Sequence, residues 1–318
     1  MREVKKRTPD RFIFRGECLS RSRKIFNKNY QLFLLMLPAV ATTFLFDYVT
    51  MYGVQIAFKD YRALQGIWGS AWVGFKHFER FIGFSKFWTL IKNTLTITLY
   101  SLATFPIGVI LSLFINEMRS LKYKKVVQMT SYAPHFLSVV VIVSMIQLLL
   151  GRANGLVNNV IYLLGGKRID FLSIPEYFPS IYVWSGVWQN AGWNTIIYIA
   201  ALAGVSQELV EAAKIDGASR LRIIWHINIP AILPTVIILF ILSTGGLLSL
   251  GYEKIILMQN PLNRPASDVI STYVFDIGIS GREYSYSTAI NLFNNVINII
   301  IIVCVNKIAN RLSGVGLW

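Results

Sequence analysis

SQELVEAAKIDGASRLRIIWHINIPAILP, residues 206–234, is the longest polar segment that lies between two apolar stretches of this chain. Ser206 can cap a helix, and Glu208 in the first turn complements the positive end of the helix dipole. The residues up to Ala213 are good helix formers. Gly217 then supplies the positive-φ residue that ends a helix and turns the chain. The segment therefore predicts a helix that stops at a glycine turn.

A second, short helix is predicted after the turn, at about 219–225. Its apolar face carries Leu221, Ile224 and Trp225. Pro230 and Pro234 are expected to mark the start of the next apolar span. We therefore expect a helix–turn–helix that lies outside the membrane and is tied to it at both ends.

Composition indicates a multi-span membrane protein. The chain has 318 residues, of which 54% are apolar, and its mean hydropathy is +0.51, well above that of an ordinary soluble domain. Its charges cluster between long apolar stretches. The net charge of +15 could suggest a nucleic-acid partner, but ten of the 31 Lys and Arg residues lie in the first 30 positions and most others flank apolar spans. We therefore expect a lipid bilayer, and no nucleic acid, around this chain.

We predict an all-α integral membrane protein with six transmembrane helices. Residues 1–30 are read as a basic cytoplasmic segment, and 31–318 as the transmembrane domain, with its polar loop at about 206–230. The predicted spans are approximately 31–49, 94–115, 126–150, 181–204, 231–250 and 285–305.

The distribution of basic residues predicts the orientation. With six spans, both termini and the 206–230 loop share one side, which holds 19 Lys and Arg residues, whereas the other side holds 12, mostly in longer loops. Basic residues in short loops favour the cytoplasm. Both termini are therefore predicted to be cytoplasmic.

Polar and aromatic side chains within the fourth and sixth spans form the second notable pattern. Such groups are expensive in lipid and usually face a cavity or another helix. Aromatic rings suit the C–H faces of a pyranose, and amides suit its hydroxyls; the alternative is helix packing with a tryptophan belt at the interface. The candidate substrate-path residues are Trp184, Trp188, Gln189, Asn190, Trp193, Asn194, Tyr198, Asn291 and Asn295.

No nucleotide-binding motif is found in the sequence. Gly165-Gly166-Lys167 is not a P-loop, because Ile161 stands where its first glycine should be and Arg168 follows the lysine. The three histidines lack metal-ligand spacing. We therefore expect no catalytic residue, cofactor or metal in this chain, and any ATP hydrolysis must come from a partner.

The 206–234 stretch also resembles a family motif. Glu211-Ala212-Ala213, Gly217, Ile227 and Ile229-Pro230, at their spacing, resemble the EAA loop of bacterial ABC importer permeases, apart from Ile229, where the family usually has Leu. In that family the loop forms a coupling helix that docks into a groove of a separate ATPase subunit. The resemblance implies ATPase-coupling roles for Glu208, Glu211, Ala212, Ala213, Asp216, Gly217, Ile227 and Pro230.

Two further stretches, MYGVQIAFKDY (51–61) and VGFKHFERF (73–81), are similar to the polysaccharide-type sugar permeases. The resemblance implies a six-span type I ABC importer permease of the bacterial inner membrane that imports oligo- or polysaccharide, with alginate favoured. It also implies a second homologous permease, two ATPase subunits that bind ATP and Mg²⁺, and an extracytoplasmic solute-binding protein. The alternatives are a permease for a peptide or lipid-linked substrate, a membrane-embedded enzyme and a structural assembly protein.

Overall fold

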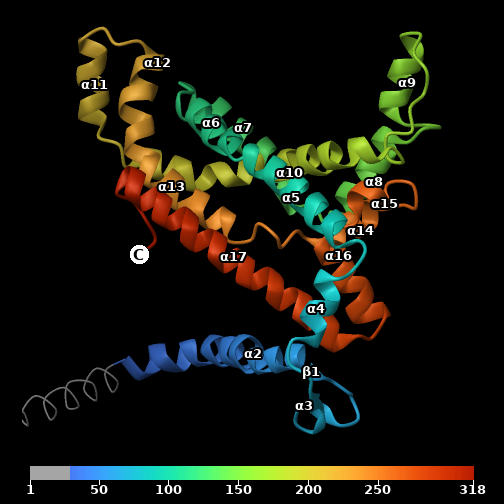
Figure 1. Ribbon diagram of the computed structural model, residues 1–318. Helices are drawn as coiled ribbons and strands as arrows, with labels where there is room; N and C mark the ends of the chain where they lie inside the picture. The colour runs from blue at the N-terminus through green and yellow to red at the C-terminus, as the bar shows by residue number, and fades with distance from the viewer. Residues whose placement is uncertain (1–28) are drawn as a thin grey trace, which may run out of the picture. The chain divides into compact units, whose positions relative to one another are not determined.

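The computed structural model describes residues 29–318 (Figure 1), and they divide after Gln55 into unit 1, described over 29–55, and unit 2, Ile56–Trp318. The predicted basic segment 1–30 lies outside the described residues except for its last two. In unit 1, residues 29–55 are helical and belong to the long helix Asn29–Phe58. Unit 2 carries the remaining helices and one short hairpin.

The helices of the described chain after residue 43 are as follows: a π-helical turn Phe44–Tyr48, α2 Val49–Met51, a 3-10 helix Tyr52–Phe58, α3 Gly66–Gly69, α4 Lys76–Ile82, α5 Phe87–Ala103, α6 Pro106–Asn116, α7 Leu121–Tyr132, a 3-10 helix Ala133–Phe136, α8 Val139–Leu150, α9 Leu156–Leu163, a 3-10 helix Pro175–Tyr177, α10 Phe178–Ala203, α11 Gln207–Ile215, α12 Arg220–Ile223, a π-helical turn Ile224–Asn228, α13 Ile229–Thr244, α14 Tyr252–Met258, α15 Arg264–Ser267, α16 Ile270–Phe275, a π-helical turn Asp276–Ser280 and α17 Tyr284–Ser313. Strands β1 (Lys59–Asp60) and β2 (Ala71–Trp72) pair antiparallel, with Lys59 opposite Trp72.

Membrane-spanning helices dominate the fold, as predicted. Four helices are long and apolar enough to cross a bilayer: Asn29–Phe58, Phe87–Asn116, Arg220–Thr244 and Tyr284–Ser313. Two bent pairs raise the number to six if each counts as one span. The prediction of an all-α integral membrane protein is therefore confirmed.

The third span is not a straight helix. α7 and α8 meet at an angle of 101°, and Pro134 lies in the 3-10 helix between them. Proline has no N–H to donate and clashes with the preceding turn. Ser138 then starts α8 by accepting a hydrogen bond from the N–H of Val141 at 3.4 Å. The predicted span 126–150 is therefore bent, which the sequence analysis did not predict.

The span after the polar loop also differs from the prediction at both ends. The predicted short helix at 219–225 does not stop there, because α12 continues through a π-helical turn into α13, with Pro230 in its first turn and Pro234 inside it. α13 then ends at Thr244, with Gly245 as its C-cap, six residues before the predicted end at residue 250. Gly245-Gly246, which could allow a bend or close packing within the span, lies at the end of this helix, and an added Cβ at Gly245 would lie 3.0 Å from the Ile302 Cδ1.

The backbone that follows α13 is not helical, and an asparagine of α17 forms hydrogen bonds with this segment. Asn298 accepts a hydrogen bond from the Leu248 N–H at 3.0 Å and donates one to the Ser249 hydroxyl at 3.0 Å. From α5, the Thr98 hydroxyl donates to the Leu247 carbonyl at 2.6 Å. Non-helical backbone is tolerated at membrane depth only where protein groups satisfy it. These contacts fix where α13 ends and where α14 begins.

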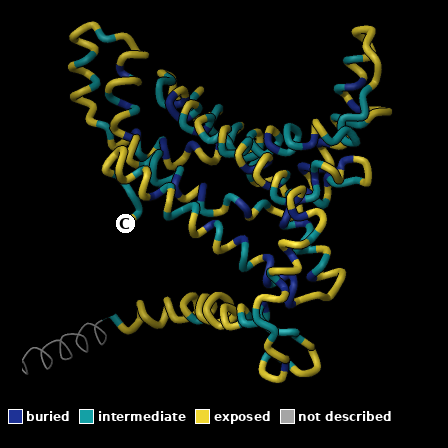
Figure 2. The backbone as a smooth tube through the Cα atoms, in the orientation of Figure 1, coloured by how far each residue is buried: buried dark blue, intermediate teal, exposed yellow. Residues whose placement is uncertain are grey.

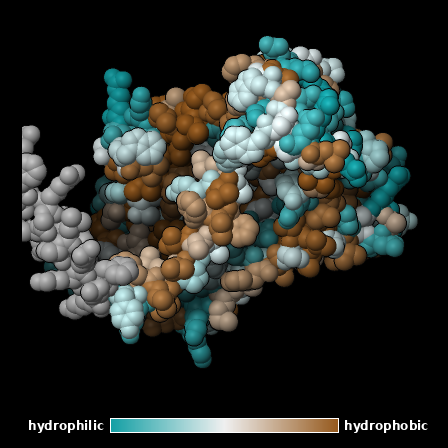
Figure 3. Space-filling view, turned by 90° about the horizontal axis from the view of Figure 1, so that it is seen from below, coloured by the Kyte–Doolittle hydropathy of each residue, from teal (hydrophilic) through white to brown (hydrophobic). Residues whose placement is uncertain are grey.

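The largest apolar core lies where α5, α8, α10 and α14 meet. Its buried members include Ile97, Ile142, Val183 and Ile255. Figure 2 shows buried positions along the inward sides of these helices, and apolar side chains also cover much of the outer face in Figure 3. An apolar exterior around a small core is what lipid requires of a membrane protein.

α7 and α10 approach closely at Gly192. A Cβ built there would lie 2.1 Å from the carbonyl oxygen of Ser131 and 2.8 Å from its Cβ. Such close backbone approach is typical of small residues at helix interfaces in membranes. Gly192 therefore sets the distance between these two helices.

We predict that Gly192→Ala lowers thermal stability, because overpacking at a backbone contact costs about 1–3 kcal/mol. The detergent-purified protein should unfold several degrees below wild type. Gly246→Ala is the matched control, since a Cβ there meets nothing within 4 Å. Equal melting temperatures for the two variants would contradict the packing described.

Candidate functional site: a cavity between the spans and an exposed loop

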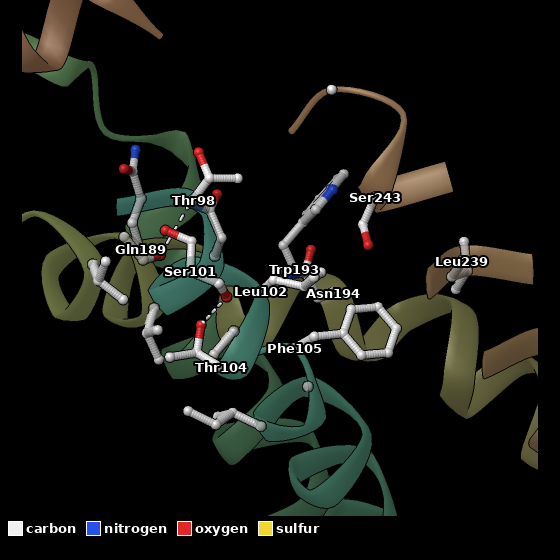
Figure 4. A pocket seen from close by; sticks show the side chains of 18 of the residues that line it. Thr98, Ser101, Leu102, Thr104, Phe105, Gln189, Trp193, Asn194, Leu239 and Ser243 are labelled. Carbon is white, nitrogen blue, oxygen red and sulfur yellow. Dashed lines mark hydrogen bonds between the residues drawn. The ribbon is translucent and has the colours of Figure 1, made fainter. Parts of the chain in front are cut away.

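A cavity of about 770 Å³ lies in unit 2, between α5, α6, α10, α13 and α14. Figure 4 shows the side chains of α5, α10 and α13 around it, among them Ser101, Trp193 and Ser243. The volume is within the range of small-molecule sites, which combine apolar walls with a few polar groups. The cavity can therefore hold a molecule of two or more sugar rings.

Five of the nine candidate substrate-path residues line this cavity. They are Gln189, Asn190, Trp193, Asn194 and Tyr198. Trp184 and Trp188 of α10 are exposed, with the Trp184 indole N–H donating to the Tyr100 hydroxyl of α5 at 2.8 Å. Asn291 and Asn295 are exposed on α17. These four do not line the cavity.

Contacts from the bend between α7 and α8 fix one wall of the cavity. The His135 ring stacks on the Trp193 ring with centroids 4.3 Å apart and planes within 6°. Its Nδ1 lies 2.9 Å from the Asn190 Oδ1. Gln189 donates to the Leu137 carbonyl at 3.2 Å. The break at Pro134 therefore positions Trp193 and the two amides.

Two polar side chains of the cavity keep free hydrogen-bonding capacity. Asn194 is exposed to the cavity and Ser101 is half-buried, and neither side chain makes a hydrogen bond to the rest of the described chain. Trp193 remains 40% exposed although His135 covers one of its faces. The cavity thus offers an open aromatic ring, a free amide and a free hydroxyl.

Sequence reasoning missed Lys254, the one charged residue among those that line the cavity in the described chain. It comes from α14, within a stretch that was read as an outer loop. Its Nζ donates to the Tyr182 carbonyl at 3.0 Å and lies 4.7 Å above the Tyr182 ring. Burial lowers the pKa of Lys254 to about 8, so the ammonium form still predominates at neutral pH. A lone lysine within YEKIILM was the available signal.

The polar loop forms a separate exposed feature at the far end of unit 2 from α9 (Figure 1). α11 ends in a Schellman turn: the Ala218 N–H bonds to the Ala213 carbonyl at 2.9 Å, and the Gly217 N–H bonds to the Lys214 carbonyl at 3.1 Å. Gly217 has φ of +76°, as predicted. Ser206 is the N-cap residue, but its side chain makes no capping hydrogen bond, which corrects the expected cap.

The candidate coupling residues of the loop are mostly exposed. This applies to Glu208, Glu211, Ala212, Asp216, Gly217 and Pro230, whereas Ala213 and Ile227 are half-buried. No ion pair within the described chain uses the three carboxylates. Of the predicted apolar face, Leu221 and Trp225 are exposed and Ile224 is half-buried, whereas Ile223, which is not part of that face, is buried. The loop therefore presents both charge and apolar surface outward.

The sequence matches a known protein family and known relatives. Residues 104–314 match the family described as binding-protein-dependent transport system inner membrane component. The chain is 41% identical over 311 residues to the polygalacturonan/rhamnogalacturonan transport system permease protein YteP of Bacillus subtilis (strain 168), covering 97% of each. It is 43% identical over 288 residues to Protein LplB of the same organism, covering 90% of this chain and 91% of that protein.

A solved structure shares the fold, and its sequence identity is close to that of the two relatives. It is the crystal structure of a bacterial ABC transporter involved in the import of the acidic polysaccharide alginate. One of its chains matches with a TM-score of 0.83 and 36% identity, covering 92% of this chain and 99% of that chain. A second crystal structure, in complex with an alginate pentasaccharide-bound periplasmic protein, matches equally well.

We predict that Gly217→Pro opens the loop to trypsin at Lys214, Arg220 and Arg222. Proline fixes φ near −65° and removes the N–H that bonds to the Lys214 carbonyl, so the turn cannot form. Gly217→Asn is the control, because asparagine tolerates positive φ. Timed digestion of the detergent-purified proteins should show faster cleavage for the proline variant alone; equal rates for all three proteins would contradict the turn's role.

Proposed function

The chain belongs to the family of binding-protein-dependent transport system inner membrane components, as a permease subunit of a carbohydrate ABC importer, and we propose that it carries acidic oligosaccharides, with fragments of alginate favoured. The observation that carries this proposal is the cavity between α5, α10 and α13. Its open Trp193 ring can pack against a sugar ring, while Asn194 and Ser101 can bond to hydroxyls.

The relatives support the acidic character of the substrate. One is named for polygalacturonan and rhamnogalacturonan, and another belongs to an importer of the acidic polysaccharide alginate. Both names denote polymers that contain uronic acids. A cavity that takes a few sugar rings suits oligosaccharide fragments of such polymers better than a whole chain.

We further propose that the 206–230 loop couples this permease to an ATPase subunit. α11 carries small side chains at Ala212 and Ala213 and ends at the Gly217 turn. Its Glu211, and Asp216 just after it, have no ion-pair partner in the described chain. Basic groups of an ATPase groove can pair with these carboxylates. ATP and Mg²⁺ then bind on the ATPase subunits, and α11 transmits the movement of those subunits to the membrane spans.

The proposed assembly contains two permeases, two ATPases and an extracytoplasmic solute-binding protein. Within unit 2, the end of α6 and the C-terminal end of α17 lie at the same end as α11 (Figure 1). This arrangement supports a cytoplasmic C-terminus, and we place the N-terminus on the same side by the charge count. ATP-driven closure of the ATPases would move α11, and the spans would open the cavity alternately to either side.

The substrate is tested by uptake into proteoliposomes that contain the complete complex. We expect ATP-dependent uptake of uronic-acid oligosaccharides at rates well above those of neutral oligosaccharides, peptides or lipid-linked sugars. Two variants on α10 locate the path. Trp193→Ala should lower uptake severalfold, because the aromatic wall is lost, whereas Trp188→Ala, on the exposed side, should stay near wild type.

Two outcomes of this experiment contradict the proposal. Uptake of peptide without any uptake of sugar would favour a peptide permease. An equal loss in both tryptophan variants would shift the path from the cavity to the exposed face of α10. Complex assembly is checked by co-purification of the ATPase with each variant.

Coupling is tested with Gly217→Pro in the same complex. We expect ATP hydrolysis to persist while uptake falls by at least about tenfold, because the turn that ends α11 is no longer held in one conformation. Gly217→Asn should retain most of the uptake. Normal uptake by the proline variant would remove the 206–230 loop from the coupling mechanism.

A further inference from the structure

Lys254 is a cation without a counter-charge in a largely apolar environment. Among the described residues, the ion pairs join Arg80 to Glu283 and Lys86 to Asp268, and none includes Lys254. Its neighbour Glu253 is exposed on α14. Burying an ammonium group is costly unless an anion or good acceptors compensate it. A carbonyl and a ring supply only part of that compensation here.

Lys254 keeps two unused N–H donors at the wall of the cavity. An ammonium has three N–H donors, and the Tyr182 carbonyl takes one of them. The adjoining wall of α10 is Gly186, where an added Cβ would lie 3.6 Å from the Nζ. Because glycine has no side chain, the Nζ can lie close to the backbone of α10, and both residues line the cavity. The Nζ makes no other hydrogen bond within the described chain, so two donors remain for a ligand in the cavity.

The position of Lys254 also fits the direction of import. α14 lies at the end of unit 2 opposite α11 (Figure 1). If α11 faces the cytoplasm, a sugar entering from outside meets Lys254 before it reaches Trp193 and Asn194 farther along α10. A charge at this point would act on the substrate at the start of its passage.

We infer that Lys254 recognises the carboxylate of a uronic-acid residue as the acidic oligosaccharide enters the cavity, and so sets the preference for acidic over neutral sugars. This inference rests on the proposed function. The carboxylate would accept charge-assisted hydrogen bonds from the two free N–H donors. A neutral sugar would leave the ammonium as poorly compensated as it is in the empty cavity.

The test compares a uronic-acid oligosaccharide with its carboxyl-reduced derivative, which keeps the sugar chain and loses the charge. Uptake by the complete complex is measured in proteoliposomes. We expect Lys254→Gln to lower kcat/KM for the acidic sugar about 10- to 100-fold, the range of a lost charge-assisted hydrogen bond, while uptake of the reduced sugar changes less than about threefold. Lys254→Arg keeps the charge and should retain most of the preference.

Lys92→Gln is the matched control, because it removes the same charge from an exposed position of α5 that does not line the cavity. It should leave the acidic-to-neutral ratio unchanged. Should the Lys254 variants fail to assemble, amine labelling of wild-type Lys254 gives a second readout. The acidic oligosaccharide should protect Lys254 from labelling, and the reduced one should not.

The outcomes separate this inference from the proposed function. Wild-type uptake of the acidic sugar with an unchanged acidic-to-neutral ratio in Lys254→Gln overturns the role of Lys254 alone. A parallel loss of both sugars also overturns it, and would instead fit pairing of Lys254 with a carboxylate of the second permease. A wild-type complex that takes up neither sugar overturns the proposed function, and this inference with it.

Discussion

The structure depends on how backbone polar groups are satisfied where helices break within the membrane domain. Lipid offers no hydrogen bonds, so every break needs protein partners. Asn298 and Thr98 supply them after α13, and Ser138 starts α8 after the proline bend. These breaks create the cavity: the bend at Pro134 brings His135 against Trp193, and the early end of α13 leaves room for α14 to bring in Lys254. An uninterrupted bundle of straight helices would place neither group there.

The two candidate functional features are built in different ways, which suits the roles proposed for them. The cavity is lined by side chains whose orientations are fixed by packing and hydrogen bonds from several helices, which suits selective contact with a sugar. The loop at 206–230 instead has a stiff backbone turn and exposed side chains, which suits contact with a partner protein. α10 runs from the cavity to the loop, and the chain bends by 77° between α10 and α11. Under the proposed coupling, a movement of α11 would reach the cavity through this bend and along α10.

The sequence predicted what depends on local pattern. Apolar runs located the spans, and Gly217 was correctly assigned its positive φ. Amides within the fourth span pointed to the side of α10 that faces the cavity at Asn190 and Asn194.

The features that the sequence analysis missed depend on tertiary contacts. Asn298 of the sixth span bonds to the backbone after α13, a contact that no local pattern predicts. Helical spacing puts Trp188 and Trp193 about 140° apart on α10, but only the tertiary contacts show that the side of Trp193 faces the cavity. Lys254 was assigned to a loop, since no periodicity shows that α14 folds back into the domain.

The central claim is that the oligosaccharide passes through the cavity between α5, α10 and α13. The most direct measurement is a cryo-electron microscopy map of the complete complex in lipid nanodiscs, trapped with a uronic-acid oligosaccharide. We predict sugar density against the open face of Trp193, within hydrogen-bonding distance of Asn194. Sugar density on the exposed side of α10 at Trp188, with the cavity closed by its own side chains, would contradict this account.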